Sequence, residues 1–364
     1  MSAGSALQDT FRPLDEKLKP RILALGLGGA GNDLLTHMMD ASLRGVYCIA
    51  GDTDRYHLQI ARAHSKLLME HASCSYGGTR GDVEVGRAVG LQACRRLRAA
   101  FDGADLIFVL AGMGGGTGGG AAPVISEAAR KSGSIVVGLI TRPFPFERQR
   151  LRAAIDSMRF MLSSCDTVIV VDNHPADPSS LMLPFRLNVD AAGQTCCSIV
   201  SSITEAFSNP SFLKGDAGEL RSMLKRGGLA KAEASHSYSH CGVEEAALNA
   251  LRKAVPAGYL SEATGVFLHI IGSENLSEVD VSSALDLVSR KINPGADILC
   301  ARQVEANLQG TTQVSLLATG IPFPYTWGGY RKLPIEIFEM EPEAGEEERV
   351  SLNFGLDQIE AISV

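Results

Sequence analysis

DLIFVLAGMGGGTGGGAAPVISEAARKSG, residues 105–133, joins an apolar run to a helix-like stretch through a loop in which seven of the ten residues at 111–120 are glycine. Glycine-rich tracts are commonly flexible linkers. A linker, however, does not normally follow a strand-like run and lead into Pro123 and a helix. The placement therefore predicts a loop between a strand and a helix, with a bare backbone shaped around a ligand.

The same alternation of strand-like and helix-like segments continues on both sides of this loop. Strand-like apolar runs cover residues 22–27, 46–50, 106–111, 135–140 and 168–171, and helix-like stretches include residues 32–42 and 84–100. Alternating strands and helices predict a parallel sheet with helices on both faces. We therefore expect an α/β fold with a doubly wound parallel-sheet domain over residues 21–180.

A long proline-free stretch follows this domain and separates it from a second one. Residues 185–207 predict one helix of about 20 residues, within a connecting segment at 181–208. Beyond it, helix-like stretches at 243–255 and 279–292 alternate with strand-like runs at 264–272, 296–305 and 312–320. This pattern predicts a smaller α+β domain over residues 209–325.

The composition fits two globular domains between polar termini. The chain has 364 residues, of which 45% are hydrophobic, and single cores seldom grow beyond roughly 250 residues. It holds no apolar run of the roughly 18 to 20 residues that cross a bilayer, and residues 1–20 lack the apolar core of a signal peptide. We expect a cytoplasmic protein without direct membrane insertion, a disordered tail at residues 1–20, and an acidic linker with a C-terminal peptide at residues 326–364.

The negative charge of the chain is confined to one segment. Its 41 acidic residues outnumber its 34 basic ones, and seven glutamates between positions 336 and 348 account for the difference. The remaining body is balanced and offers no basic surface, so we expect no nucleic-acid partner. His236, His240 and Cys241 have spacings found in metal sites, but the stretch SHSYSHCG is a poor helix and favours a solvated loop without a metal.

A first glycine motif precedes the loop quoted above. Gly26, Gly28 and Gly31 in GLGGAGND satisfy G-x-G-x-x-G at a strand-to-helix turn. Such glycines let backbone amides approach phosphate oxygens, and the helix N-terminus adds partial positive charge. Asp52 and Asp54 follow about 20 residues later, at the distance of the ribose-binding carboxylate in dinucleotide enzymes. Alone, the motif fits either a nicotinamide-dependent enzyme or a close-packed turn.

The second glycine cluster favours a longer phosphate chain that is held from both sides. A nicotinamide-binding sheet needs one phosphate-binding turn, and GGGTGGG would be unexplained in such an enzyme. The loop glycines supply amides that form an anion-binding concavity, and Thr117 offers a hydroxyl to phosphate or Mg²⁺. The motif G-x-x-x-x-G-K-[ST] and its lysine are absent. We therefore expect a nucleotide site that depends on amides and a metal ion.

Several motifs together resemble one family. GLGGAGN, GDTD, EVGR, GGGTGGGAAPV, TRPFPFE and the late NPGADI and ATG stand in the order and approximate spacing of the FtsZ/tubulin superfamily, most similar to archaeal FtsZ-type proteins, over residues 21–321. The resemblance implies a GTP-binding domain, a long central helix and a C-terminal domain that polymerise head to tail with GTP and Mg²⁺. It implies a division ring at mid-cell or, for a divergent paralogue, control of cell shape.

The resemblance also implies which residues bind GTP. They are Gly28, Gly29, Ala30, Gly31 and Asn32 in the first loop, Asp54 in GDTD, Gly114, Gly115, Gly116, Thr117, Gly118, Gly119 and Gly120 in the second loop, Glu147 and Arg150 beside the ribose, and Phe185, Asn188 and Asp190 beside the base. Gly119 stands where the family usually has a small polar residue or alanine, so we expect a looser loop. Arg80 is open to two interpretations, a cation at the terminal phosphate or a solvated surface arginine.

Hydrolysis in this family is completed by the next subunit, whose loop after the long helix inserts two carboxylates against the neighbour's terminal phosphate to position water. In KGDAGELRSML the resemblance assigns Asp216 and Glu219 to these carboxylates, with Lys214 in place of a customary asparagine. Carboxylates at i and i+3 at a helix start face the same way. The pair also fits plain N-capping, with Glu219 completing a capping box, and both interpretations can hold together.

The C-terminal stretch NFGLDQIEAISV (353–364) resembles the tethered peptide by which FtsZ proteins reach a membrane anchor or division protein. A short apolar peptide on a flexible linker gains avidity once the body polymerises. The alternative for this stretch is a segment that folds back on its own domain. The alternative for the whole chain is a filament or regulatory protein that binds nucleotide with weak or no hydrolysis, which Gly119, Lys214 and Val189 favour.

Overall fold

The computed structural model describes residues 19–72, 74, 78–144, 147–171, 185–209, 212–213, 216–237, 242–254, 261–305, 308 and 311–322, and of residues 185–189 and 217 only the backbone. Most of the tail expected at residues 1–20, and all of the linker and peptide expected at residues 326–364, lie outside the described residues. None of the helices in the described ranges is both long and apolar enough to cross a membrane.

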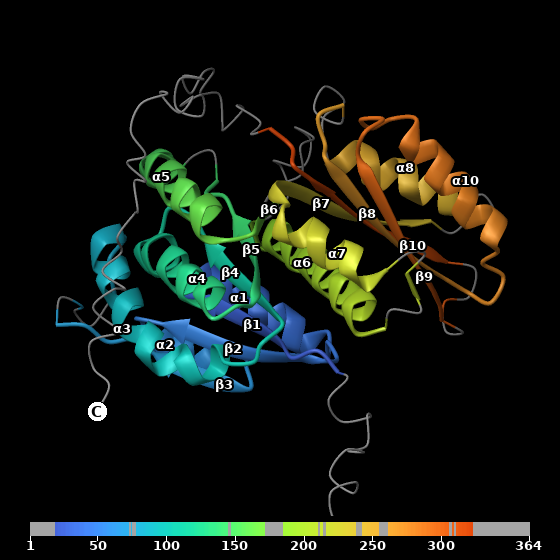
Figure 1. The fold of residues 1–364 in the computed structure, drawn as a ribbon. Coiled ribbons are helices and arrows are strands. Elements are labelled where there is room, and N and C mark those ends of the chain that lie inside the picture. The colour runs from blue at the N-terminus through green and yellow to red at the C-terminus, as the bar shows by residue number, and fades with distance from the viewer. Residues whose placement is uncertain are drawn as a thin grey trace, which may run out of the picture.

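The first half of the described chain alternates strands and helices, as the sequence predicts (Figure 1). Its elements are β1 (Ile22–Leu27), α1 (Gly28–Asp40), β2 (Val46–Asp52), α2 (Arg55–Ile60), β3 (Ser65–Leu68), α3 (Val83–Phe101), β4 (Leu106–Gly112), a π-helical turn η1 (Thr117–Ala121), α4 (Ala122–Lys131), β5 (Ile135–Thr141), α5 (Arg148–Ser164) and β6 (Thr167–Val171). The helix expected at 32–42 begins earlier, inside the first glycine motif. The short α2 and β3 are additions that the apolar pattern does not predict.

The second half begins with the long helix expected from the proline-free stretch. Its elements are α6 (Phe185–Ser208), α7 (Ala217–Lys225), β7 (Gly228–Ser237), α8 (Gly242–Ala254), β8 (Gly265–Gly272), α10 (Glu278–Ser289), β9 (Asp297–Val304) and β10 (Thr312–Thr319). The loop expected around His236 is wrong at that residue, because His236 lies in β7 with an exposed side chain. His240 and Cys241 lie outside the described residues.

The ten strands of the described residues form one sheet in the order β3-β2-β1-β4-β5-β6-β7-β10-β8-β9. The neighbours from β3 to β7 are parallel, β10 is antiparallel to both β7 and β8, and β9 is parallel to β8. The doubly wound parallel sheet is therefore confirmed. The two predicted domains nevertheless share one sheet, because β6 pairs with β7 from Thr167↔Gly228 to Val170↔Lys231.

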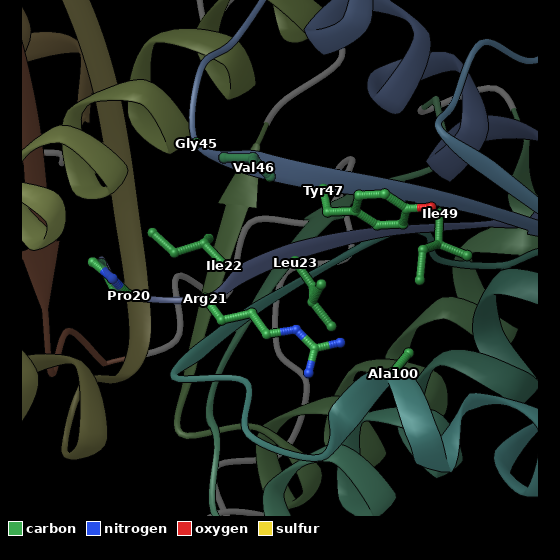
Figure 2. Close-up of a pocket in the computed structure, with 9 residues that line it drawn as sticks. All are labelled: Pro20, Arg21, Ile22, Leu23, Gly45, Val46, Tyr47, Ile49 and Ala100. Carbon is green, nitrogen blue, oxygen red and sulfur yellow. The ribbon is translucent and has the colours of Figure 1, made fainter. Parts of the chain in front are cut away.

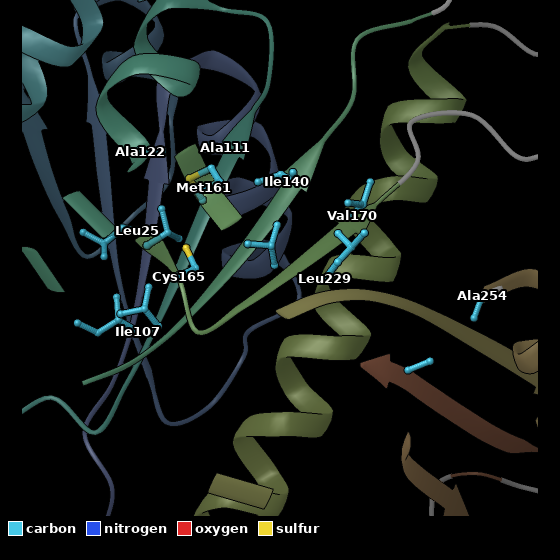
Figure 3. Packing of buried hydrophobic residues seen from close by; sticks show 14 of the residues in the cluster. Leu25, Ile107, Ala111, Ala122, Ile140, Met161, Cys165, Val170, Leu229 and Ala254 are labelled. Carbon is cyan, nitrogen blue, oxygen red and sulfur yellow. The ribbon is translucent and has the colours of Figure 1, made fainter. Parts of the chain in front are cut away.

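Helices cover both faces of this sheet and bury two apolar layers. Residues of β1 alternate between the layers: Ile22 and Ala24 belong to the layer that includes residues of α1, α2, α6 and α7, whereas Leu23 and Leu25 belong to the layer that includes residues of α3, α4, α5, α8 and α10. Figure 3 shows the second layer extending from Leu25 and Ile107 past Ile140 to Val170 and Leu229. Burial of apolar surface thus continues across the β6–β7 boundary and joins the two halves of the molecule.

A polar pair, of which only the histidine is fully buried, connects α6 to the C-terminal strands. His269 of β8 is fully buried, and its Nε2 lies 3.9 Å from Oε2 of Glu205 on α6. The Glu205 carboxylate accepts a hydrogen bond from the Ser201 hydroxyl at 3.0 Å. Burial lowers the pKa of His269 to about 4 and raises the pKa of Glu205 above its ordinary value. The imidazole is therefore neutral near pH 7 and charged only in strong acid.

We expect stability to fall below pH 6.5 because of His269. Between pH 6.5 and about 4, His269 is protonated in the unfolded chain but neutral in the native protein. The free energy of unfolding therefore rises with pH in this window. From pH 6.5 to pH 5 the loss amounts to about 2 kcal/mol. Glu205 contributes with the opposite sign, because its raised pKa favours the native state at lower pH. Denaturant unfolding of wild type and His269→Gln at both pH values measures the difference; equal pH slopes in the two proteins would contradict it.

Candidate functional site

The two glycine loops leave the sheet side by side. β1 pairs in parallel with β4, with Leu27 opposite Ala111, so the loops that follow them begin at the same edge. Gly28 has a φ of +73°, and a Cβ on it would lie 3.0 Å from the Gly118 nitrogen and 3.2 Å from Cβ of Thr117. A side chain at position 28 would therefore separate the two loops, which glycine allows to touch.

Two helix N-termini without side-chain caps meet at this edge. Neither α1, which starts at Gly28, nor the π-helical turn, which starts at Thr117, has a capping hydrogen bond or an acidic residue in its first turn. By contrast, Asp54, Asp82 and Asp216 cap α2, α3 and α7. Free amides at a helix N-terminus favour an anion. The arrangement therefore suits a phosphate chain lying across both loops.

Most glycines of the second loop have no room for a side chain, because neighbouring backbone packs against them. A Cβ on Gly120 would collide with the Val83 carbonyl oxygen, and one on Gly86 would collide with the Gly116 carbonyl oxygen, because α3 lies directly on the loop. Gly31 similarly permits contact between α1 and the Leu110 carbonyl. Gly115 alone among Gly114–Gly120 has open space at its Cβ position, with nothing within 4 Å. The interpretation of these glycines as amide donors is therefore incomplete, since most of them also allow backbones to touch.

Gly119 is held tightly between the loop and α5. A Cβ there would lie 2.5 Å from Oγ of Ser157, a fully buried residue of α5 whose hydroxyl has no hydrogen-bond partner among the described residues. The expectation of a looser loop at Gly119 is therefore wrong. Glycine at this position makes room for the serine on the neighbouring helix.

We expect Gly119→Ala to destabilise the protein by about 1–3 kcal/mol, because the new methyl group overpacks against Ser157. Ser157→Ala should be close to neutral alone, since it removes a hydroxyl without a partner. The double variant should recover at least about 1 kcal/mol relative to the sum of the single changes. Urea unfolding of the four proteins checks this; additive effects would show that the two residues are not coupled.

Three threonine hydroxyls contact one another where the second loop meets the end of β2. Oγ1 of Thr117 lies 2.8 Å from Oγ1 of Thr53 and 3.3 Å from Oγ1 of Thr79, and Thr117 is only 8% exposed. Thr117 is among the residues predicted from the sequence, whereas Thr53 and Thr79 are not. Thr53 lies inside GDTD and Thr79 inside GGTRGD, just before EVGR, so the positions of these motifs could have indicated both residues. The hydroxyls give this part of the site a polar surface beside the free amides.

Asn32 and Asp54 have structural contacts in this fold. Asn32 is buried, and its Nδ2 donates to Oδ2 of Asp52 and to the Gly51 carbonyl, both at 3.2 Å. Burial raises the pKa of Asp52, opposed by hydrogen bonds from the Asp54 and Thr53 amides. Oδ1 of Asp54 accepts from the Tyr56 amide at 2.8 Å, as the cap of α2. These bonds fix the end of β2 against the start of α1.

The remaining residues of the first loop lie at its open side. Gly29 is half-buried beside His57, whose Nδ1 would be 3.2 Å from a Cβ on the glycine. Ala30 is exposed, and its Cβ would lie 2.6 Å from a Cβ on Gly112, the last residue of β4. The first turn of α1 therefore extends from the loop contact to the surface.

Glu147 and Arg150 lie at the other end of the second loop. Nη1 of Arg150 donates to Oε1 of Glu147 at 2.7 Å, and Oε2 of Glu147 accepts from the Phe144 amide at 2.9 Å. Gly114, with a φ of +88°, is so close that a Cβ on it would lie 2.5 Å from the Arg150 carbonyl oxygen. The structure thus brings Glu147, Arg150 and the second loop together.

The residues expected at the base begin α6. Oδ1 of Asp190 lies 3.4 Å from Nε2 of His37 on α1, and Gly193 packs on the same imidazole. α6 therefore starts against the helix that carries the first loop. The backbone of Phe185 and Asn188 belongs to its first turn, and their side chains lie outside the described residues.

Asp216 caps α7 and Glu219 lies in its first turn, at the opposite edge of the sheet. Within α7, Arg221 lies 3.6 Å from Asp105, which precedes β4, and the Leu224 carbonyl accepts from the hydroxyl of Thr167, the first residue of β6. These are amino ends of strands, roughly 20 Å from the glycine loops at the carboxyl ends. Oδ1 of Asp216 accepts from the Gly218 amide at 3.0 Å, and Glu219 is exposed. The structure therefore does not bring these carboxylates to the glycine loops of the same chain.

A hollow of about 480 Å³ lies at this same amino-end edge (Figure 2). It is lined by Pro20, Arg21, Ile22, Leu23, Gly45, Val46, Tyr47, Ile49 and Ala100. It contains none of the predicted site residues, and no cluster of metal-ligating side chains occurs in the described part of the chain. The candidate site is accordingly the pair of glycine loops at the opposite edge.

Comparison with known proteins agrees with this geometry. Residues 21–176 match the Tubulin/FtsZ family, GTPase domain, and residues 228–322 match the FtsZ family, C-terminal domain. The cell division protein FtsZ 1 of Pyrococcus furiosus is 32% identical over 322 residues, covering 88% of this chain and 86% of that protein. The cell division protein FtsZ 2 of Methanocaldococcus jannaschii is 32% identical over 321 residues, covering 87% and 84%.

Solved structures share the fold as well. An FtsZ dimer from M. jannaschii superposes with a TM-score of 0.77 at 27% identity, over 84% of this chain and 89% of that one. A protofilament of CetZ2 from Haloferax volcanii superposes with a TM-score of 0.72 at 22% identity, over 87% and 96%. With two glycine loops at one sheet edge, a long helix between two modules, and sequence matches over most of its length, the chain belongs to the tubulin/FtsZ family.

Proposed function

We propose that this protein is a GTP-binding cytoskeletal protein that assembles head to tail and hydrolyses GTP between adjacent subunits. The observation that carries this proposal is the separation of the two halves of the site. The uncapped helix N-termini lie at the carboxyl ends of the strands, whereas α7 with Asp216 and Glu219 is held at the amino ends. One chain cannot bring them together, but a stack of identical chains can. Such a heterologous contact generates a linear filament.

In this proposal the phosphates lie on the amides of both loops. The first-turn residues Gly28 to Asn32 and the open face at Gly115 contact the phosphate chain, and Glu147 and Arg150 flank the ribose. Asp54, Phe185, Asn188 and Asp190 stay candidates for the ribose and base side. Mg²⁺ prefers oxygen ligands and is commonly bound together with nucleotide phosphates. The hydroxyl oxygens of Thr53, Thr79 and Thr117 fit that preference. Bound there, it would neutralise phosphate charge.

Asp216 and Glu219 of the next subunit would hold the attacking water against the terminal phosphate. Asp216 is the N-cap of α7 and Glu219 lies in its first turn, so both belong to the same helix start. Hydrolysis would therefore depend on assembly and would weaken the contact that enabled it. We place the GTP-binding unit at residues 21–180, the connecting helix at 181–208 and the C-terminal unit at 209–325.

One specific observation supports a second candidate, a filament protein that binds nucleotide without hydrolysing it. Oδ1 of Asp216 is already engaged with the Gly218 amide as the helix cap. Sedimentation with GTP, GDP, a non-hydrolysable GTP analogue or NAD, with phosphate release followed in parallel, separates the candidates. We expect pelleting with GTP, and phosphate release that rises more than linearly with protein concentration. Pelleting without release supports the second candidate, and a response to NAD alone contradicts both.

The cellular role would be a division ring at mid-cell in the cytoplasm, or control of cell shape.

We expect deletion of residues 351–364 to leave assembly and phosphate release unchanged while removing co-sedimentation with a membrane anchor or division protein. An internal deletion of equal length within 326–350 is the matched control, since it shortens the linker and keeps the peptide. Loss of GTP binding on removal of residues 351–364 would instead indicate that the segment folds onto its own domain.

A further inference from the structure

The loop between β3 and α3 contains an arginine in an unusual backbone conformation. Gly78, Arg80 and Gly81 have φ values of +71°, +53° and +85°. Left-handed backbone is ordinary for glycine, but a residue with a Cβ avoids it. Arg80 is one of two such residues in the described chain, the other being Ser42. Strained residues of this kind persist where the surroundings hold them, commonly in ligand-binding loops.

The residues on either side of Arg80 contact the second glycine loop and the end of β2. On its N-terminal side, a Cβ on Gly78 would lie 2.7 Å from Oγ1 of Thr53, and Oγ1 of Thr79 lies 3.3 Å from Oγ1 of Thr117. On its C-terminal side, the Asp82 carboxylate accepts from the Glu84 amide at 2.9 Å and caps α3, which lies on Gly116. The backbone of Arg80 is thus fixed at the edge of the candidate phosphate site.

The guanidinium of Arg80 is exposed and makes no ion pair with any described residue. Other arginines around the site do have carboxylate partners. Arg150 contacts Glu147, Arg87 lies 3.7 Å from Glu84, and Arg55 lies 3.7 Å from Glu70. Arg80 is therefore a cation beside the free amides whose charge is not neutralised within the described chain.

Arg80 lies at the end of the second loop opposite Glu147, where the terminal phosphate of a bound nucleotide would lie. Gly114 abuts Arg150 and the Glu147 side of the site, whereas Gly116 and Thr117 abut Thr79 and the Arg80 side. A nucleotide with its ribose beside Glu147 would run its phosphate chain along the second loop towards Arg80. Arginine binds phosphate oxygens bidentately and more strongly than neutral donors do.

Building on the proposed function, we infer that Arg80 binds the terminal phosphate of the triphosphate held by its own chain and is the residue by which the site distinguishes GTP from GDP. The amides of the two loops hold the phosphates common to both nucleotides. The guanidinium adds a contact that only the triphosphate reaches. The left-handed backbone at Arg80 keeps this contact in place.

Equilibrium binding of a non-hydrolysable GTP analogue and of GDP, at protein concentrations below assembly, tests this inference. Arg80→Ala should weaken binding of the analogue about 10- to 100-fold, the range of a charge-assisted hydrogen bond to phosphate, and change GDP binding less than about threefold. Arg80→Lys should fall between wild type and Arg80→Ala. Arg44→Ala, which removes an exposed arginine between α1 and β2, is the matched control and should bind both ligands as wild type does.

Each other outcome has a definite meaning. An unchanged ratio of analogue to GDP affinity in Arg80→Ala, or an equal loss for both ligands, overturns the inference and leaves the proposed function standing. Wild-type protein that binds neither nucleotide overturns the proposed function itself. Arg80→Gly, which removes the guanidinium and suits the backbone, should match Arg80→Ala in binding and unfold at no lower temperature than wild type. Analogue binding retained by Arg80→Gly but lost by Arg80→Ala would assign the effect to the backbone and overturn the inference.

Discussion

Asp216→Asn is expected to bind GTP within about threefold of the wild-type affinity and to release phosphate at least about 100-fold more slowly once assembled. Asp216 caps the helix that is held at the amino ends of the strands, so we expect its own chain to bind nucleotide without it. The reaction is slowed, because Glu219 alone then has to position the neighbour's attacking water. Asparagine caps a helix about as well as aspartate does, so α7 stays intact.

The comparison with Asp216→Ala separates capping from catalysis. Alanine removes the cap as well and should cost about 1 kcal/mol of stability, while lowering phosphate release no more than asparagine does. Phosphate release is measured on pelleted protein, with sedimentation as the control for assembly. A mixture of Asp216→Asn with a variant that cannot bind nucleotide but keeps Asp216 should regain hydrolysis, since each supplies what the other lacks. Wild-type release by assembled Asp216→Asn would contradict the assignment.

Gly120→Ala and Gly115→Ala are expected to fail in opposite ways, although both add one methyl group to the same loop. At position 120 the methyl meets the Val83 carbonyl and, at 2.7 Å, the Arg87 amide nitrogen, both backbone atoms of α3. Overpacking of this kind costs about 1–3 kcal/mol or more. At position 115 nothing lies within 4 Å, so stability should change by less than about 0.5 kcal/mol.

The open space at Gly115 is where a phosphate chain would lie in the proposed function, so Gly115→Ala should weaken GTP binding at least about 10-fold. Thermal unfolding without nucleotide and equilibrium binding with GTP measure the two effects separately. A Gly115→Ala protein that unfolds as early as Gly120→Ala would show that the packing explanation is wrong. One that binds GTP normally would place the phosphates elsewhere.

The sequence predicts eight of the ten strands, because these eight are largely apolar runs. β1 matches its predicted range, and α6 matches the proline-free stretch within a residue. The elements α2, β3 and β7 escape prediction, because RYHLQI is largely polar, SKLL spans four residues and GLAKAEASHS contains no apolar run. The shared sheet also escapes it, since the pairing of β6 with β7 joins segments that are far apart in the chain.

The sequence predicts where the two glycine loops lie, but it does not show why each glycine is needed. Glycine patterns locate both loops, yet they cannot distinguish glycines that face a ligand from those that touch a helix. Gly86 and Gly120 have no room for a side chain because α3 packs directly on the second loop. Gly119 has none because of Ser157. Only the packed structure reveals these contacts. The separation of Asp216 from the glycine loops likewise depends on which strand ends α7 contacts.

The pairing of β6 with β7 gives the subunit a mechanical property. In a head-to-tail filament each subunit is held at its glycine loops and at α7, which lie at opposite ends of the strands. Tension between these contacts would run along the strands and load the β6–β7 ladder in shear, so that its hydrogen bonds share the force and must yield together. The subunit would therefore resist such tension better than it would if the hydrogen bonds of this ladder were broken one at a time.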